Sequence, residues 1–264
     1  MSLIYNGTTT YASIANESAF DFDRTDPFSF SFWCKGTVSE TTIFSKLTIG
    51  GNYTGWEIAT PVGQVRWQFI SLIGSARLLV DSTSRIDDGL WHHVAITQNG
   101  GRFADCGLYV DGVDEGTNII DTLTSGSTLN NVVPRIGRRN DNTIEYSGQI
   151  TDMVVWGAEL TAAEVLAIYA SKMKYSALLI KQSDLVSYWP ANDQPHGTAA
   201  VGETMADVVG GNDGTIVNSG TWQGETLLSY PGGIIVPGLS AAVFGGKSLL
   251  DGFETPLLRS VLAA

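Results

Sequence analysis

The segment 88–113 constrains the fold more than any other part of the chain. Residues 91–96, Trp-His-His-Val-Ala-Ile, alternate with the two-residue period of a β-strand, and Leu108–Val110 forms a second short strand. Between them, residues 99–101 are Asn-Gly-Gly, which tolerate the positive φ angles that a reversal requires. Asp111-Gly112 is a pair typical of a tight hairpin turn. The segment therefore predicts two successive antiparallel hairpins.

The remaining strands are expected in short stretches between glycine- and proline-rich turns. Phe28, Phe30 and Phe32 alternate with smaller residues, so we expect all three on the core-facing side of one strand. Many short strands at close spacing predict a β-sandwich or jelly roll. The further strands are expected within Leu3–Ile14 (two strands), Ile43–Lys46, Trp56–Ala59, Val65–Phe69, Leu78–Val80 and Gly148–Trp156.

One helix is expected after these strands. Thr161 and Glu164 have the spacing of a capping box, which marks the first turn of a helix. Val165, Leu166 and Tyr169 are expected to share one face. Because the helix has few charges, we expect it to lie flat on the edge of the sandwich and to close it.

Several of these segments resemble the laminin-G-like domain of the concanavalin A-like lectin/glucanase superfamily. The resemblance rests on Trp91–Ala95, Leu108–Gly112, Ile136-Gly137 and the segment from Gly148 to Glu164, and it covers roughly Leu3 to Tyr169. These motifs occur in the order that the family shows. The resemblance implies an all-β fold, a two-sheet antiparallel jelly-roll sandwich of about a dozen strands.

The order of two other segments departs from the family pattern. Such domains usually open with a strand resembling Leu185–Pro190 and a segment resembling 207–215, but here both follow the helix. Either a second, truncated domain begins at Leu185, or the domain is circularly permuted. Too few residues remain after Asp213 for a second jelly roll, and permutation is easy where termini lie close together. We therefore expect one domain, residues 1–230, in which 183–230 supplies the permuted first strands.

The last segment, 231–264, is expected to be an apolar C-terminal arm. Its glycines, alanines and prolines oppose a long helix, and ordering it costs about 1–2 kcal/mol per residue of backbone entropy. That cost requires extensive apolar burial, which we expect on other protein chains of an oligomeric assembly. The predicted docking residues are Ile234, Ile235, Val236, Leu239, Phe244, Leu250, Phe253, Leu257 and Leu258.

The net charge of −12 limits the partners of the chain. It disfavours nucleic acid, because the phosphate backbone would be repelled. No apolar run approaches the length of a membrane-spanning helix, and residues 1–7 lack the basic and apolar regions of a secretory signal. We therefore expect neither nucleic acid nor a membrane as partner.

The sequence does not indicate catalysis. Glucanases of the superfamily place acidic residues alternately on one strand, so that two carboxylates face the sugar, and no strand here carries that alternation. His92 and His93 are neighbours on a strand and point to opposite faces, so they cannot act as one pair. We expect structural roles for both histidines and predict that the protein is not an enzyme.

No metal or cofactor is predicted. The histidines and cysteines lack the spacing of zinc ligands. Cys34 and Cys106 could form a disulfide, but we favour two free buried thiols. Some relatives bind calcium through loop carboxylates, yet no loop shows the dense oxygen spacing of a cage, so calcium is left open. The carboxylates that could contribute are Asp105, Asp111, Asp141 and Asp152.

Exposed aromatic residues beside amides and charges are the best candidates for glycan or partner contacts. Sugar rings stack on aromatic side chains, and sugar hydroxyls require hydrogen-bond donors and acceptors. The competing interpretation is an ordinary solvated loop tip. The candidate contacts are Asn52 with Tyr53, and Arg138, Arg139, Asn140, Asp141 and Asn142 with Tyr146.

Two functions fit these observations. The first is a non-enzymatic structural or interaction protein of a virion surface, such as a phage capsid-decoration, head or fibre component. Laminin-G-like domains recur in such proteins, and an acidic chain with an apolar tail suits assembly inside a cell. The alternative is a free carbohydrate-binding lectin module. We favour the first, with the protein on the virion surface; the alternative would place it outside the cell.

Overall fold

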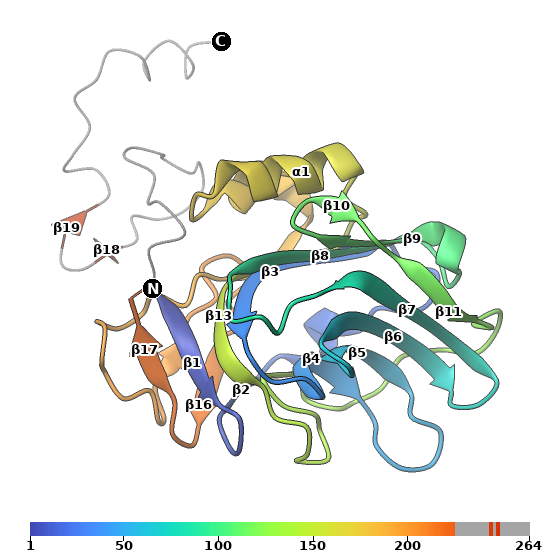
Figure 1. The fold of residues 1–264 in the computed structure, drawn as a ribbon, viewed down its shortest axis with the longest axis horizontal. Helices are drawn as coiled ribbons and strands as arrows, with labels where there is room; N and C mark the ends of the chain where they lie inside the picture. Colours follow the sequence, from blue (N-terminus) through green and yellow to red (C-terminus); the bar gives the residue numbers. More distant parts are fainter. Residues whose placement is uncertain (225–242, 245–246, 249–264) are drawn as a thin grey trace, which may run out of the picture.

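A computed structural model describes residues 1–224, 243–244 and 247–248. Within the first range, two antiparallel β-sheets pack face to face, and one α-helix lies outside them (Figure 1). The prediction of an all-β, two-sheet jelly-roll sandwich is confirmed. In the part of the chain that the structure describes, no helix is long and apolar enough to cross a membrane.

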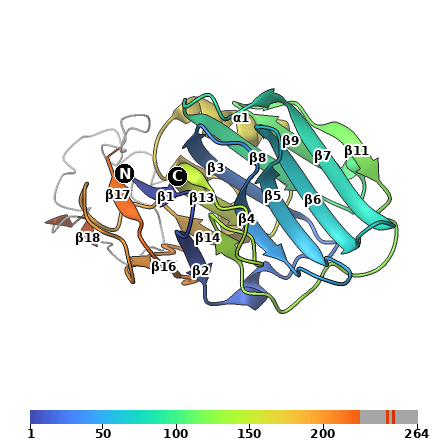
Figure 2. The same ribbon diagram turned by 60° about the horizontal axis from the view of Figure 1, so that its bottom comes forward.

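The strand order of the two sheets defines the sandwich (Figure 2). Within residues 1–224, the eight-stranded sheet has the order β10 (Val113–Asp114), β9 (Cys106–Val110), β8 (His92–Gln98), β3 (Phe28–Gly36), β13 (Ser147–Trp156), β1 (Ser2–Asn6) and β17 (Thr221–Gln223), and β14 (Leu185–Trp189) also pairs with β13. The nine-stranded sheet has the order β11 (Thr117–Asp121), β7 (Ala76–Arg85), β6 (Gln64–Leu72), β5 (Gly55–Thr60), β4 (Thr41–Leu47), β12 (Arg135–Ile136), β2 (Tyr11–Ile14), β16 (Gly214–Val217) and β15 (Thr204–Met205). A separate two-stranded ladder joins β18 (Val243–Phe244) to β19 (Lys247–Ser248). Short 3₁₀ turns occur at Glu17–Phe20, Phe103–Asp105, Ser176–Leu179 and Gln182–Asp184.

The two hairpins predicted in residues 88–113 are present. β8 pairs with β9, and β9 pairs with β10, both antiparallel. Asp111 and Gly112 have φ angles of 51° and 79°. A two-residue hairpin turn with positive φ at both positions matches the twist of its strands, which explains the Asp-Gly pair.

The core between the sheets is rich in aromatic side chains. Phe28, Phe30 and Phe32 on β3 are fully buried in it, so the core-facing prediction for these three residues is confirmed. The Phe30 ring lies 4.9 Å from the ring of Trp56, a residue of the opposite sheet. Aromatic pairs at this separation add to the stability that burial gives.

The helix α1 (Ala162–Ser171) begins at the predicted capping box. The Thr161 hydroxyl accepts a hydrogen bond from the backbone N–H of Glu164, and the Glu164 carboxylate accepts one from the backbone N–H of Thr161. The predicted location was wrong, because α1 covers the outer face of the eight-stranded sheet instead of its edge (Figure 1). Val165 and Ile168 are its buried residues, whereas Leu166 is 51% exposed.

The segment after the helix contributes strands to both sheets. β14 pairs with β13 and β17 pairs with β1 in one sheet, whereas β16 pairs with β2 in the other. Trp189 and Trp222 are buried in the core between the sheets. The domain boundaries at 183–230 and the circular permutation stay predictions.

Most of the predicted arm, 231–264, lies outside the described residues. Phe244 belongs to β18, and nothing is described of its side chain. The other predicted docking residues, all outside the described part, are Ile234, Ile235, Val236, Leu239, Leu250, Phe253, Leu257 and Leu258.

Both cysteines are free thiols. Cys34 pairs in register with His92 at one end of β8, and Cys106 pairs with Gln98 at the other end. Six residues of strand separate those positions by about 20 Å, far beyond the reach of a disulfide. The alternative of a disulfide is therefore wrong.

Candidate ligand-binding face

The outer face of the nine-stranded sheet carries a row of polar side chains in one register. Ile58 on β5 and Trp67 on β6 are buried in the core, so their strand neighbours Glu57 and Gln68 face outward. Strand pairing aligns equivalent outward residues on six adjacent strands. We call this set the polar row: Thr215 (β16), Ser13 (β2), Arg135 (β12), Ser45 (β4), Glu57 (β5) and Gln68 (β6).

Glu57 is the buried charge of the polar row. Its side chain is 0% exposed, and Arg139 forms two hydrogen bonds with its carboxylate oxygens, at 2.8 and 2.7 Å. Thr42 Oγ1 and Gln68 Nε2 also donate to the carboxylate, at 3.0 and 2.8 Å. Burial opposes the charged form of Arg139, but the hydrogen bonds and charge of Glu57 outweigh it, so the pKa of Arg139 is raised. The carboxylate therefore fixes the positions of Arg139 and Gln68.

A second ion pair lies beside the polar row. Arg66 on β6 donates to both carboxylate oxygens of Asp81 on β7, at 2.6 and 2.7 Å. The hydrogen bond to Asp81 raises the pKa of Arg66, against the opposing effect of burial. Such bidentate pairs hold the guanidinium plane in a defined orientation, which suits recognition of a polar ligand.

Tyr53 is the aromatic residue near this part of the polar row. It is half-buried, follows the exposed Asn52, and lies close enough to Arg139 to contribute to the raised pKa of that residue. Its φ of 51° lies in the left-handed region, which bulky residues rarely adopt. Tyr53 and Arg139, two predicted contacts that are far apart in the sequence, are therefore electrostatically coupled.

The loop of residues 138–145 crosses the outer face above β4. Asn140 Oδ1 accepts a hydrogen bond from the Ser45 hydroxyl at 3.3 Å, and Asn140 Nδ2 donates to the Val133 carbonyl at 2.8 Å. Asp141 Oδ1 accepts from the backbone N–H and hydroxyl of Thr143, at 3.0 and 2.6 Å. The side chains of Asn140 and Asp141 therefore hold the loop in place, and Asn142 remains exposed.

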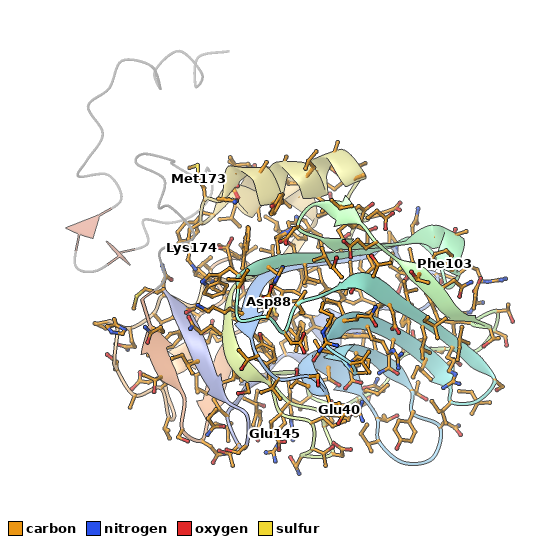
Figure 3. The ribbon with its side chains drawn as sticks, viewed as in Figure 1. Glu40, Asp88, Phe103, Glu145, Met173 and Lys174 are labelled. Carbon is orange, nitrogen blue, oxygen red and sulfur yellow. The ribbon has the colours of Figure 1, made fainter. Side chains whose placement is uncertain are left out.

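Arg138 and Glu145 form an ion pair at 3.0 Å within this loop. Figure 3 shows Glu145, with Glu40, at the end of the molecule opposite α1. Thr42 donates its backbone N–H to the Ile144 carbonyl at 3.0 Å, which ties this end of the loop to β4. The loop is therefore anchored at several points along its length.

Tyr146 is not a surface contact, and this part of the predicted site was wrong. Its side chain is 3% exposed and packs between the sheets, edge-on to the Tyr5 ring at 6.0 Å. Burial, with the nearby Cys34, raises the pKa of its hydroxyl. Tyr146 immediately precedes β13, where the chain turns inward, so a sugar cannot stack on it.

Tyr11 is an outward aromatic residue that the sequence prediction missed. The guanidinium carbons of Arg135 and Arg138 lie 4.8 and 5.4 Å from the centre of its ring. The sequence prediction also missed Arg135. It missed Glu57, the ion-pair partner of Arg139, and Gln68, which donates to Glu57. The alternation in Val65–Phe69 was the available signal for Gln68, because it assigns Arg66 and Gln68 to the side away from the core.

The two adjacent histidines have separate, structural environments. His92 lies between two carboxylates, with Nδ1 2.9 Å from Asp111 Oδ2 and Nε2 3.0 Å from Asp88 Oδ1. Its pKa is raised, chiefly by the hydrogen bond to Asp111. His93 is fully buried on the opposite side of the strand, with Nε2 2.8 Å from the Ser31 hydroxyl, and burial lowers its pKa to about 4.

The carboxylates considered for calcium have other partners. Asp111 contacts His92, and Asp152 accepts a hydrogen bond from the Tyr188 hydroxyl. Across the described residues, no group of three or more histidine, cysteine, aspartate or glutamate side chains could hold a metal ion.

Two antiparallel sheets in a jelly roll, with a polar outer face, define a lectin-like sandwich. The family model of the concanavalin A-like lectin/glucanases superfamily matches residues 6–166, which is more than half of the chain. The chain therefore belongs to this superfamily, as its sequence motifs implied. A search of curated protein sequences gave no significant match.

Solved structures are similar to this chain at low sequence identity. A Bacteroides ovatus protein, provisionally described as carbohydrate-binding, aligns with a TM-score of 0.57 and 16% identity over 87% of this chain and 62% of its own. The binding domain of Paraclostridial Mosquitocidal Protein 1 gives 0.48 and 18%, over 61% and 40%. Domains LG4-5 of mouse laminin α1 give 0.46 and 16%, over 58% and 41%. The chain thus spans less than two thirds of each, and at these identities the similarity concerns the fold alone.

Proposed function

We propose that this protein is a non-enzymatic recognition module that binds a glycan on the outer face of its nine-stranded sheet. The observation that carries the proposal is the row of fixed polar groups around the buried Glu57–Arg139 ion pair, with half-buried Tyr53 in the loop before β5. An aromatic ring offers a stacking surface for a sugar, and fixed amide and guanidinium groups offer partners for its hydroxyls. Gln68 and Arg66 extend these polar groups along β6.

The charges on this face support binding over hydrolysis. Glycoside hydrolysis requires two carboxyl groups, one that donates a proton and one that acts as a base or nucleophile. Glu57 is held by Arg139, Asp81 by Arg66, and Glu145 by Arg138. Carboxylates neutralised by guanidinium groups are poor proton donors and weak nucleophiles, so we expect no glycosidase activity.

The test is a glycan array probed with the full chain, followed by affinity measurements on two variants of Tyr53. Tyr53→Ala removes the stacking surface and should weaken binding of the best glycan about tenfold. Tyr53→Phe keeps the ring and serves as the matched control, with an affinity close to that of the unmodified chain. Equal affinities for all three proteins would contradict the proposed site.

The particle-surface role is the second part of the proposal. We infer that the module is held on a virion surface by residues 231–264, whose apolar composition suits packing on other chains. The net charge of −12 supports a self-repelling surface that stays soluble until assembly. The alternative is a free lectin module outside the cell, in which this segment covers its own sandwich.

Deletion of residues 232–264 separates these alternatives. If the segment is a docking arm, the shortened protein should fold with an unchanged unfolding temperature but should no longer assemble, as light scattering or particle binding would show. A shortened protein that assembles as well as the full chain would exclude the arm.

A further inference from the structure

Two arginines share one aromatic ring at the Tyr11 end of the polar row. Arg135 lies on β12, Arg138 follows it, and both guanidinium groups lie over the Tyr11 ring on β2. A cation over an aromatic face is attracted by the negative charge of that face. The Nε atoms of both arginines are buried and have no hydrogen-bond partner. Donation to a ligand therefore falls to their terminal Nη groups.

The three arginines at this end of the row differ in their partners. Arg138 is paired with Glu145 at 3.0 Å, and Arg139 is paired with Glu57 at 2.7 Å. Within residues 1–224, Arg135 has no carboxylate partner. Its Nη1 donates only to neutral oxygens of the loop, chiefly Asn142 Oδ1 at 2.8 Å. Arg135 therefore has no ion-pair partner beside the half-buried Tyr11 ring, and Asp141, the third carboxylate of this end, accepts from Thr143.

The loop fixes the Arg135 guanidinium in place. Asn142 accepts from Arg135 through its side chain and from Arg138 Nη2 through its carbonyl, at 2.8 Å in both cases. The backbone N–H of Asn142 donates to the Arg139 carbonyl at 3.2 Å, which closes a turn around the two arginines. Guanidinium groups already held in one geometry lose little conformational entropy when an oxyanion binds them.

We propose that Arg135, with Arg138 and Tyr11, forms a subsite for one acidic group of a saccharide, a carboxylate or a sulfate ester. The inference rests on the proposed glycan function and names the ligand class. Arg135 and Gln68 lie in the same register, about 14 Å apart across three strand spacings. A short oligosaccharide bound at Tyr53 and Gln68 can therefore extend to Arg135.

The subsite accepts a single acidic group and not a polyanion. The chain has 27 acidic residues against 15 basic ones, so a polymer with many charges is repelled by the rest of the surface. At physiological salt this repulsion acts within about 8 Å of each charge, whereas an ion pair at the subsite is in direct contact. One acidic group on an otherwise neutral oligosaccharide is the best match.

The experiment compares a trisaccharide that carries one uronic acid, an aldotriouronic acid, with its carboxyl-reduced neutral counterpart by isothermal titration calorimetry, using the full chain. We expect the acid to bind about tenfold more tightly, as a charged hydrogen-bonded pair would give. Arg135→Gln should remove this preference and Arg135→Lys should keep part of it. Arg77→Gln, the same charge change on β7 of the same sheet, should leave the preference intact. Equal binding of acid and neutral sugar would overturn the subsite while leaving the glycan proposal standing.

A second measurement decides the inference if neither trisaccharide binds. Sodium sulfate is titrated at constant ionic strength against chloride, and the ring signals of Tyr11 are followed by NMR. The subsite predicts a saturable shift in the unmodified chain and in Arg77→Gln, and none in Arg135→Gln. Absence of the shift in the unmodified chain would contradict the inference. Tighter binding of heparin than of the single acid would contradict its restriction to one group.

Discussion

Glu57 is the residue on which the geometry of the polar row depends most. Replacing Glu57 by Gln leaves Arg139 beside a neutral amide in a partly buried site. Breaking a buried ion pair on one side costs about 3–5 kcal/mol, so the free energy of unfolding should fall by an amount in that range. Urea unfolding measures this loss, and the double variant Glu57→Gln/Arg139→Gln should recover part of it. A loss below about 1 kcal/mol would show that the Glu57–Arg139 ion pair does not hold the side chains of the polar row in place.

The neighbouring histidines should give opposite slopes in the dependence of stability on pH. Burial lowers the pKa of His93 to about 4. Below about pH 6.5, His93 of the unfolded chain takes up a proton, whereas folded His93 stays neutral. The stability should therefore fall as the pH drops from 6.5 toward 4. The total loss approaches about 3 kcal/mol. His93→Gln should flatten this part of the curve.

His92 acts in the other direction. Its pKa is raised by Asp111 and Asp88, so its contribution is full below the unfolded pKa of about 6.5 and is lost as the pH rises through the folded value. His92→Gln should remove that loss on the alkaline side. Urea unfolding of both variants between pH 4 and 9 tests both signs, and the same slope for the two variants would contradict the assignment.

The sequence could locate some site residues but not the direction of their side chains. Tyr53 and Arg139 were predicted because each lies in a polar loop, and in the fold the two are electrostatically coupled. Tyr146 stands just as close to the polar loop in sequence, yet it precedes β13 and turns inward. Local polarity could not distinguish these cases, because the direction of each tyrosine is set by the strand beside it.

At the scale of elements, α1 shows which parts of a helix a single sequence determines. The capping box of Thr161 and Glu164 fixed its start through local hydrogen bonds. Its buried face depends on the sheet that it packs against. The sequence spacing was compatible with Leu166 on the buried face, whereas the structure buries Ile168 there. The strand of Phe28, Phe30 and Phe32 was predictable because alternation alone specifies two faces.

Two substitutions in α1 test its packing. Ile168→Ala should destabilise the protein by about 2–5 kcal/mol, because it leaves a cavity against the outer face of the eight-stranded sheet. Leu166→Ala is the matched control, because Leu166 is on the exposed side of the helix. It should change stability by no more than about 0.5 kcal/mol. Thermal unfolding measures both losses of stability. A larger loss for Leu166→Ala than for Ile168→Ala would show that Leu166, and not Ile168, faces the sheet.

At the scale of the whole molecule, the segment after α1 joins both sheets. Lys174 is buried just after the end of α1, and its Nζ donates to the Pro190 carbonyl at 2.5 Å, which links this connection to the end of β14 (Figure 3). Trp189 and Trp222 then fill the core between the sheets. The sequence indicated these late strands only through the family resemblance, because the strands that tie them into the sandwich, β1, β2 and β13, come before α1.

Truncation tests this interdependence. A chain of residues 1–183 loses β14, β16 and β17 and exposes the edges that they cover. We expect insoluble protein or a molten state without a cooperative unfolding transition. A soluble fragment 1–183 that melts cooperatively would instead favour an independent second unit after α1.

The central claim is that the outer face of the nine-stranded sheet binds a glycan at Tyr53 and the polar row. The most direct measurement is an NMR titration of the isotope-labelled full chain with the tightest glycan from the array. The account predicts saturable shifts concentrated at Tyr53, Gln68 and Arg139, with little change at α1. Shifts concentrated at α1 or on β8 and β9, with Tyr53 and Gln68 unaffected, would contradict it.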